Sequence, residues 1–100
     1  MSDTAVKTRD LVTVNQKAPG KYKVIVCNDD YTPMEFVIVM LISVFRHSQE
    51  AATDLTLAIH NDGSAVAGVY TYEIAEQKGI DATMLAREHG HPLVIKVEQE

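Results

Sequence analysis

Two polar features of the sequence could bind a charged ligand: the run Asn28-Asp29-Asp30 and the histidine at position 60. Asn28 supplies an amide carbonyl and Asp29 a carboxylate, and both are acceptors suited to the three donors of an ammonium group. The same run is also typical of a turn, because Asn and Asp side chains accept hydrogen bonds from their own backbone. His60 could likewise cap helix carbonyls or hydrogen-bond a ligand. Spacing alone leaves both pairs of alternatives open.

Catalysis, metal binding and cofactor binding find little support in the side chains. Cys27 is the single cysteine, so Cys27 with His60 is the only Cys–His pair, and Cys27 lies in an apolar run as a buried small hydrophobe would. His47, His89 and His91 lack cysteine or acidic partners at a recognised metal spacing. The five glycines are scattered and form no phosphate-binding loop. We therefore expect a protein that is not an enzyme and has no catalytic residue, metal or cofactor.

Composition narrows the class of protein further. A chain of 100 residues with 46% hydrophobic and 23% charged residues suits one globular domain. Its net charge of -5 argues against nucleic-acid binding, which usually needs a basic face. No stretch reaches the roughly 18 apolar residues of a membrane span, and residues 1–20 lack the apolar run of a signal peptide. With a lone cysteine as well, we expect a cytoplasmic protein that binds neither nucleic acid nor membrane.

The elements that must position Asn28-Asp29-Asp30 come directly before and after it. Residues 1–20 show no sustained period and predict a flexible N-terminal tail, followed by a core domain over residues 21–100. Tyr22–Cys27 predicts a strand. Thr32 is a predicted N-cap, with Pro33 and Glu35 in the first turn of a helix. The body of this helix, residues 36–45, is apolar almost all round, so it must be covered on two sides or lend a flank to a ligand pocket.

The remaining elements follow from caps and periodicity. Ser48 is the predicted N-cap of a second helix, which ends at Asn61-Asp62-Gly63. The predicted buried stripe of this helix consists of Ala51, Ala52, Leu55, Ala58 and Ile59. A strand over Ala65–Tyr70 precedes a third helix, capped by Thr71, weakened by Gly79 and ending near Glu88. The last strand is Leu93–Val97, with Leu93, Ile95 and Val97 inward. The order βααβαβ predicts an α+β fold: a two-layer α/β sandwich with three helices on one face of a three-stranded antiparallel sheet.

Four sequence blocks together resemble one known family. They run from about Lys21 to Val97 and are Asn28-Asp29-Asp30-Tyr31-Thr32-Pro33-Met34-Glu35-Phe36-Val37, Ile59-His60, Gly68-Val69-Tyr70-Thr71 and His91-Pro92-Leu93. The chain thereby resembles ClpS, the family of bacterial adaptors of the ClpAP protease. An unbroken ten-residue motif with three further blocks in order is far more specific than the acidic pair or the histidine alone. A rival interpretation, an interaction domain like the C-terminal domain of the ribosomal stalk protein, has no need of the Asn-Asp-Asp loop.

The resemblance implies a function and a role for particular residues. It implies a monomeric adaptor that recognises N-degrons, proteins whose first residue is Leu, Phe, Tyr or Trp, and delivers them to the ClpA ATPase. Asn28, Asp29 and His60 would then hold the α-amino group and first peptide unit, with Asp29 acting directly or through water. The pocket for the first side chain would be lined or rimmed by Asp30, Thr32, Met34, Val37, Thr56, Ile59 and Leu93. Glu73 and Lys78 would contact ClpA, and the tail before Pro19 would be engaged by the ATPase during delivery.

This sequence departs from the family pattern at two positions. Thr56 stands where methionine is usual, and that methionine is associated with the shape of the pocket and the exclusion of β-branched first residues. Because threonine is smaller and more polar, we hypothesise an altered ranking among Leu, Phe, Tyr and Trp, or partial tolerance of Ile. Cys27 stands where bulkier residues are common, which would repack the site locally.

Overall fold

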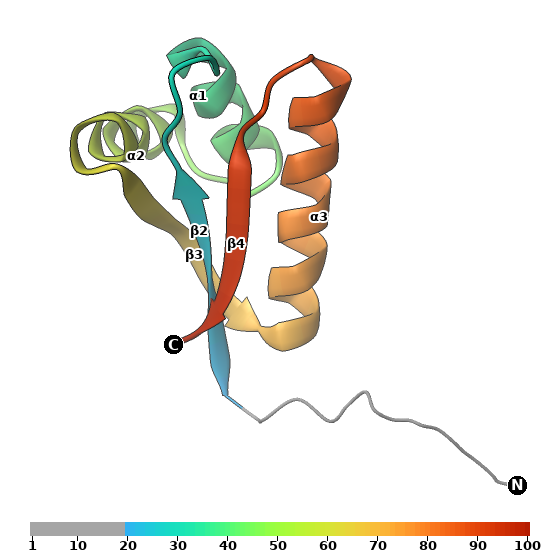
Figure 1. Cartoon of the computed structure of the whole chain (residues 1–100). Helices are drawn as coiled ribbons and strands as arrows, with labels where there is room; N and C mark the ends of the chain where they lie inside the picture. The colour runs from blue at the N-terminus through green and yellow to red at the C-terminus, as the bar shows by residue number, and fades with distance from the viewer. Residues whose placement is uncertain (1–19) are drawn as a thin grey trace, which may run out of the picture.

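The computed structural model describes residues 20–100, in which strands and helices follow one another in the order β2, α1, α2, β3, α3, β4 (Figure 1). Their bounds are β2 Lys21–Cys27, α1 Met34–Ser43, α2 Gln49–Asp62, β3 Ser64–Thr71, α3 Tyr72–Glu88 and β4 Val94–Gln99. The predicted βααβαβ order and α+β class are confirmed. The predicted tail lies, apart from Gly20, outside the described residues. Within residues 20–100, no helix combines the length and apolarity that crossing a membrane requires.

The sheet is antiparallel in the order β3-β2-β4, so β2 is the central strand. β2 pairs with β3 from Lys21 opposite Thr71 to Cys27 opposite Ser64. The register shifts between Val24 and Ile25, which leaves Ala67 as an extra, bulged residue of β3. The Ala67 carbonyl accepts a hydrogen bond of 2.6 Å from His47 Nε2, which must therefore carry the proton. The loop between α1 and α2 is thus tied to the edge strand.

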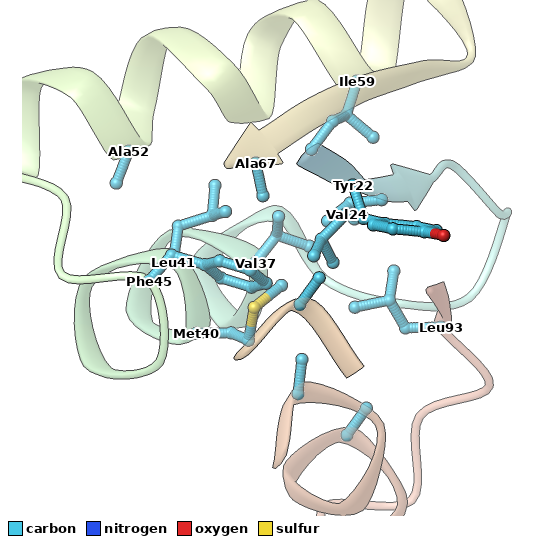
Figure 2. Close-up of a cluster of buried hydrophobic side chains, with 14 residues drawn as sticks. Tyr22, Val24, Val37, Met40, Leu41, Phe45, Ala52, Ile59, Ala67 and Leu93 are labelled. Carbon is cyan, nitrogen blue, oxygen red and sulfur yellow. The ribbon is translucent and has the colours of Figure 1, made fainter. Parts of the chain in front are cut away.

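One face of the sheet carries all three helices. Tyr22, Val24 and Val26 alternate along β2 and are buried, and Figure 2 shows Tyr22 and Val24 among side chains from α1 and α2. Met40 and Leu41 of α1 are fully buried, which stabilises the fold by roughly 1.5–3 kcal/mol each. None of the helices described in residues 20–100 covers the opposite face, which carries residues from all three strands: Lys21, Lys23, Ile25, Cys27, Val66, Val69, Val94, Lys96 and Glu98.

Small residues let α3 lie close to the sheet. Its buried positions are Ala75, Gly79, Ala82 and Ala86. A Cβ atom at Gly79 would lie only 3.1 Å from Val97 Cγ2, so glycine permits the close approach of helix and strand. The loss of helix propensity predicted for Gly79 is therefore offset by packing against β4.

The predicted helix ends are partly confirmed. Ser48 caps α2, accepting a hydrogen bond of 3.1 Å from the Ala51 amide, and α2 ends at Gly63, whose φ is 93°. Thr71 is the N-cap residue of α3, although its side chain makes no capping hydrogen bond. The prediction that Thr32 caps α1 was wrong, because Pro33 is the N-cap residue and no side chain caps this helix. The Thr32 hydroxyl instead donates a hydrogen bond to the Asp29 carboxylate, and the charge of this acceptor strengthens the bond.

Candidate functional site

The loop between β2 and α1 is organised by the Asp29 carboxylate. Oδ1 accepts hydrogen bonds of 2.8 Å from the backbone amides of Tyr31 and Thr32, and Oδ2 accepts one of 2.8 Å from the Thr32 hydroxyl. The turn-forming role that the sequence allowed for this residue is therefore present. A carboxylate has about four acceptor positions, so Oδ2 retains one for a ligand. Asp29 can build the loop and still present negative charge to a cation.

The charge of Asp29 is held by its surroundings. Partial burial raises the pKa of this carboxyl, but the Thr32 hydroxyl, the amides of Tyr31 and Thr32 and the nearby His91 outweigh that effect and lower it below 3.8. A lowered pKa means that the ionised carboxylate stabilises the folded loop above about pH 4. This contribution is lost as the pH falls through the lowered pKa, so at neutral pH the site keeps a fixed negative charge.

The other two predicted amine ligands flank this loop. The backbone amide of Asn28 donates a hydrogen bond of 2.8 Å to the Gly63 carbonyl. This bond fixes the loop against the C-terminal end of α2, the helix that carries His60. The side chains of Asn28 and His60 are exposed. Within residues 20–100 His60 caps no carbonyl, since the end of α2 is closed by the Gly63 amide bonding to Ile59. Both side chains are thus available to a ligand at this end of the domain.

The predicted pocket residues divide into a buried group and a rim. Val37, Ile59 and Leu93 come from α1, α2 and the residue before β4 and belong to one buried cluster (Figure 2). Thr32 is half-buried, and Asp30 and Met34 are exposed. Three elements far apart in the sequence therefore bring these apolar side chains together in the core.

Thr56 is the buried polar member of this group. Its side chain is 2% exposed, and its hydroxyl donates a hydrogen bond of 2.7 Å to the Ala52 carbonyl one turn earlier in α2. The bond satisfies the hydroxyl inside the helix and leaves the methyl group to meet neighbours. The stripe of α2 is accordingly Ala52, Thr56 and Ile59, whereas Leu55, predicted in that stripe, is only half-buried.

A histidine pair supports the loop from the end of α3, and no local sequence pattern predicts it. The Phe36 ring lies 4.7 Å from the His91 ring and 5.4 Å from the His89 ring, measured between centroids. His91 also acts electrostatically on Asp29. The family block His91-Pro92-Leu93 was the only feature that marked this segment. Within residues 20–100 no group of three potential ligands could hold a metal ion.

The two residues predicted to contact the ATPase differ in accessibility. Glu73 is exposed in the first turn of α3. Lys78 is half-buried and donates a hydrogen bond of 2.7 Å to the Val44 carbonyl at the end of α1, where a cation also complements the helix dipole. Lys78 therefore joins two helices, and Glu73 is the more accessible of the two residues.

Cys27 is half-buried with a free thiol.

A groove that the sequence did not predict lies elsewhere, between α3 and β4. It has a volume of about 490 Å³ and contains none of the predicted site residues. This hollow is therefore separate from the Asp29 loop, and the loop remains the candidate site because it combines a fixed negative charge with the exposed side chains of Asn28 and Asp30.

Comparison with known proteins identifies the family. The model of the family described as ATP-dependent Clp protease adaptor protein ClpS matches residues 17–96. A ClpS from Hyphomonas neptunium is 46% identical over 98 residues, covering 98% of this chain and 80% of that protein. An Escherichia coli ClpS is 48% identical over 93 residues, covering 93% of this chain and 84% of that protein.

A solved structure agrees with the family model and with these two relatives. The structure of Agrobacterium tumefaciens ClpS2 bound to L-phenylalaninamide matches with a TM-score of 0.80 and 46% identity, covering 83% of this chain and 100% of that chain. Sequence, fold and family model all point to an adaptor protein and not to an enzyme. The chain belongs to the ClpS family of adaptor proteins of the Clp protease.

Proposed function

We propose that this chain binds the free α-amino group and the large hydrophobic first residue of N-degron substrates, namely Leu, Phe, Tyr or Trp, and delivers them to the ClpA ATPase of the ClpAP protease. It acts as a monomer in the cytoplasm. Glu73 and Lys78 contact the ATPase, which engages the tail before Pro19 during delivery.

One observation carries the first part of this proposal: a relative 46% identical to this chain binds L-phenylalaninamide. That ligand has a free α-amine, an aromatic side chain and an amide where the next peptide unit would begin. In this proposal Asn28, Asp29 and His60 hold the α-amino group and the first peptide unit. Val37, Thr56, Ile59 and Leu93 line the pocket for the first side chain, and Asp30, Thr32 and Met34 rim it.

The physical basis of recognition is the charge of a chain start. A free α-amine has an unperturbed pKa near 7.7–8.0 and is mostly protonated at pH 7, whereas an interior peptide nitrogen carries no charge. The ionised Asp29 therefore distinguishes a first residue from every other residue. Burial of a large apolar side chain contributes roughly another 1.5–3 kcal/mol, so the amine and the side chain are both required.

The test compares a fluorescent peptide beginning with free Phe with its N-acetylated twin. We expect acetylation to weaken binding by about 10- to 100-fold, because each hydrogen bond to a charged group is worth roughly 1.5–3 kcal/mol. The side chain of the acetylated peptide still matches the pocket, so weak residual binding remains. Fluorescence anisotropy at pH 7 measures both affinities, and equal binding of the two peptides would rule out the amine clamp.

Thr56 leads to a separate prediction about side-chain choice. Thr56→Met should change the ranking of peptides beginning with Leu, Phe, Tyr, Trp and Ile, with Ile losing most, about tenfold relative to Leu. The longer side chain fills space beside Ile59, and pockets of this kind resolve one methylene by roughly 1–3 kcal/mol. Competition anisotropy with the five peptides gives the ranking. An unchanged order would mean that Thr56 does not shape the pocket.

A further inference from the structure

The connection between α3 and β4 carries two side chains of the candidate site. The His91 ring lies 4.7 Å from the Phe36 ring, measured between centroids, and acts electrostatically on Asp29. Leu93 is 1% exposed, belongs to the buried cluster and is one of the residues proposed to line the pocket. Residues 89–93 belong to neither helix nor strand, so their backbone groups need partners outside regular secondary structure.

The first half of this connection is held by the end of α3. Gly90 has a φ of 76°, the left-handed conformation that commonly ends a helix. The chain turns back there, and the His91 amide donates a hydrogen bond of 2.8 Å to the Ala86 carbonyl. Pro92 has no N–H, so the peptide unit that joins His91 to Pro92 can be held only through its carbonyl oxygen.

The Arg87 guanidinium binds the second half of the connection. Its Nη1 donates hydrogen bonds of 2.9 Å to the His91 carbonyl and of 2.9 Å to the Leu93 carbonyl. An Nη atom carries two hydrogens, so each carbonyl receives one of them. Arg87 lies in the last turn of α3, and both of its acceptors lie beyond the end of the helix. The side chain therefore ties the backbone on either side of Pro92 to α3.

We propose that Arg87 is a positioning residue for N-degron binding, which acts through Leu93 on the side-chain pocket and through His91 on the Asp29 loop. Arg87 is exposed and is not among the residues proposed to contact the N-degron. Its two hydrogen bonds fix the backbone that presents Leu93 and His91. The inference rests on the proposed function, because it requires the pocket and the Asp29 loop to take part in binding.

A cation at the end of α3 also has a purely structural use. Lys or Arg in the last turn of a helix complements the helix dipole, and a lysine at position 87 would do this equally well. The observed geometry goes further, since Nη1 bonds to two carbonyls outside α3. Lysine has a single terminal nitrogen on a stem one bond shorter, so we expect it to reach only one of the two carbonyls.

The test measures peptide binding by Arg87→Met, Arg87→Lys and the control Arg46→Met. Arg46 is exposed in the loop between α1 and α2, so its substitution removes the same charge from a different connection. Peptides beginning with free Phe and free Leu are titrated by fluorescence anisotropy, well below the melting temperature. We expect Arg87→Met to weaken the Phe peptide about tenfold and the Leu peptide about threefold, because the larger side chain depends more on where Leu93 lies.

The ratio of the two affinities separates positioning from stability. A protein that is merely less stable binds both peptides less by the same factor, so its ratio stays that of the unmodified chain. Arg87→Lys should fall between the unmodified chain and Arg87→Met, and Arg46→Met should bind both peptides as the unmodified chain does. Circular dichroism checks folding, and Arg87→Lys, which keeps the cation at the end of α3, provides the same comparison if Arg87→Met does not fold.

Three outcomes would overturn this inference alone. An unchanged ratio in the folded Arg87 variants would reduce Arg87 to a structural residue. Unaltered binding by Arg87→Lys would mean that only its charge matters. Equal losses in Arg46→Met and Arg87→Met would mean a general effect of net charge. Equal binding of free and N-acetylated Phe peptides by the unmodified chain would overturn the proposed function itself, and this inference with it.

Discussion

Asp29→Ala is expected to weaken the binding of a Phe-initiated peptide by more than about 100-fold. The substitution removes the negative charge that we propose faces the α-amine, and loss of a hydrogen bond to a charged group costs roughly 1.5–3 kcal/mol. It also removes the acceptor of three hydrogen bonds that hold Tyr31 and Thr32 in place. Because Thr32 and nearby Met34 belong to the proposed rim, we expect the substitution to damage both the amine and the side-chain subsites. N-acetylation of the peptide removes only the first of them, so its effect is smaller.

Asp29→Asn separates the two contributions. The asparagine carbonyl can still accept from the Tyr31 and Thr32 amides, so the turn is retained while the charge is lost. We expect a loss of about tenfold, intermediate between the unmodified chain and Asp29→Ala. Anisotropy with the free Phe peptide measures all three proteins, and circular dichroism checks that each is folded. If Asp29→Asn bound as the unmodified chain does, Asp29 would only build the loop and the amine would be held by other groups.

The element order could be predicted from the sequence because the helix caps and the hydrophobic periodicity mark the individual helices and strands. Ser48 and Gly63 marked the two ends of α2, and the alternation of Tyr22, Val24 and Val26 marked the buried face of β2. Caps and alternation involve residues that are close in sequence, so they can be recognised without knowledge of the tertiary structure.

Contacts between distant residues could not be predicted in this way. The Thr32 hydroxyl had two possible partners: it could accept a hydrogen bond from a backbone amide at the start of α1 or donate one to the Asp29 carboxylate, and sequence spacing favours the first. The contact of Lys78 with the Val44 carbonyl and that of His91 with Phe36 depend on how α3 packs against α1. The candidate site was found through its family motif, because turn formation and amine binding require the same residue types in the Asn28-Asp29-Asp30 run.

The space beside Gly68 is taken by a side chain, and Gly68→Ala is expected to lower the free energy of unfolding by about 1 kcal/mol. A Cβ atom at Gly68 would lie 2.6 Å from Cζ of Tyr70, two residues later on the same strand. The φ angle of Gly68 is not positive, so its backbone does not require glycine. The Tyr70 ring must therefore move. It is partly buried, which raises the pKa of its hydroxyl, and Lys78 Nζ lies 5.9 Å from its centroid, so moving the ring disturbs both contacts. We expect a drop of roughly 4–8 °C in the melting temperature.

A double-mutant cycle with Tyr70→Ala tests this explanation of Gly68. Once the ring is absent, Gly68→Ala should be neutral or stabilising by up to about 1 kcal/mol, because alanine restricts the unfolded chain more than glycine does. The coupling energy should then be about 1–2 kcal/mol, within the range for residues in contact. Urea denaturation of the four proteins supplies the free energies. If Gly68→Ala cost the same with and without the ring, the strain would lie in the strand pairing next to the Ala67 bulge and not in the Tyr70 side chain.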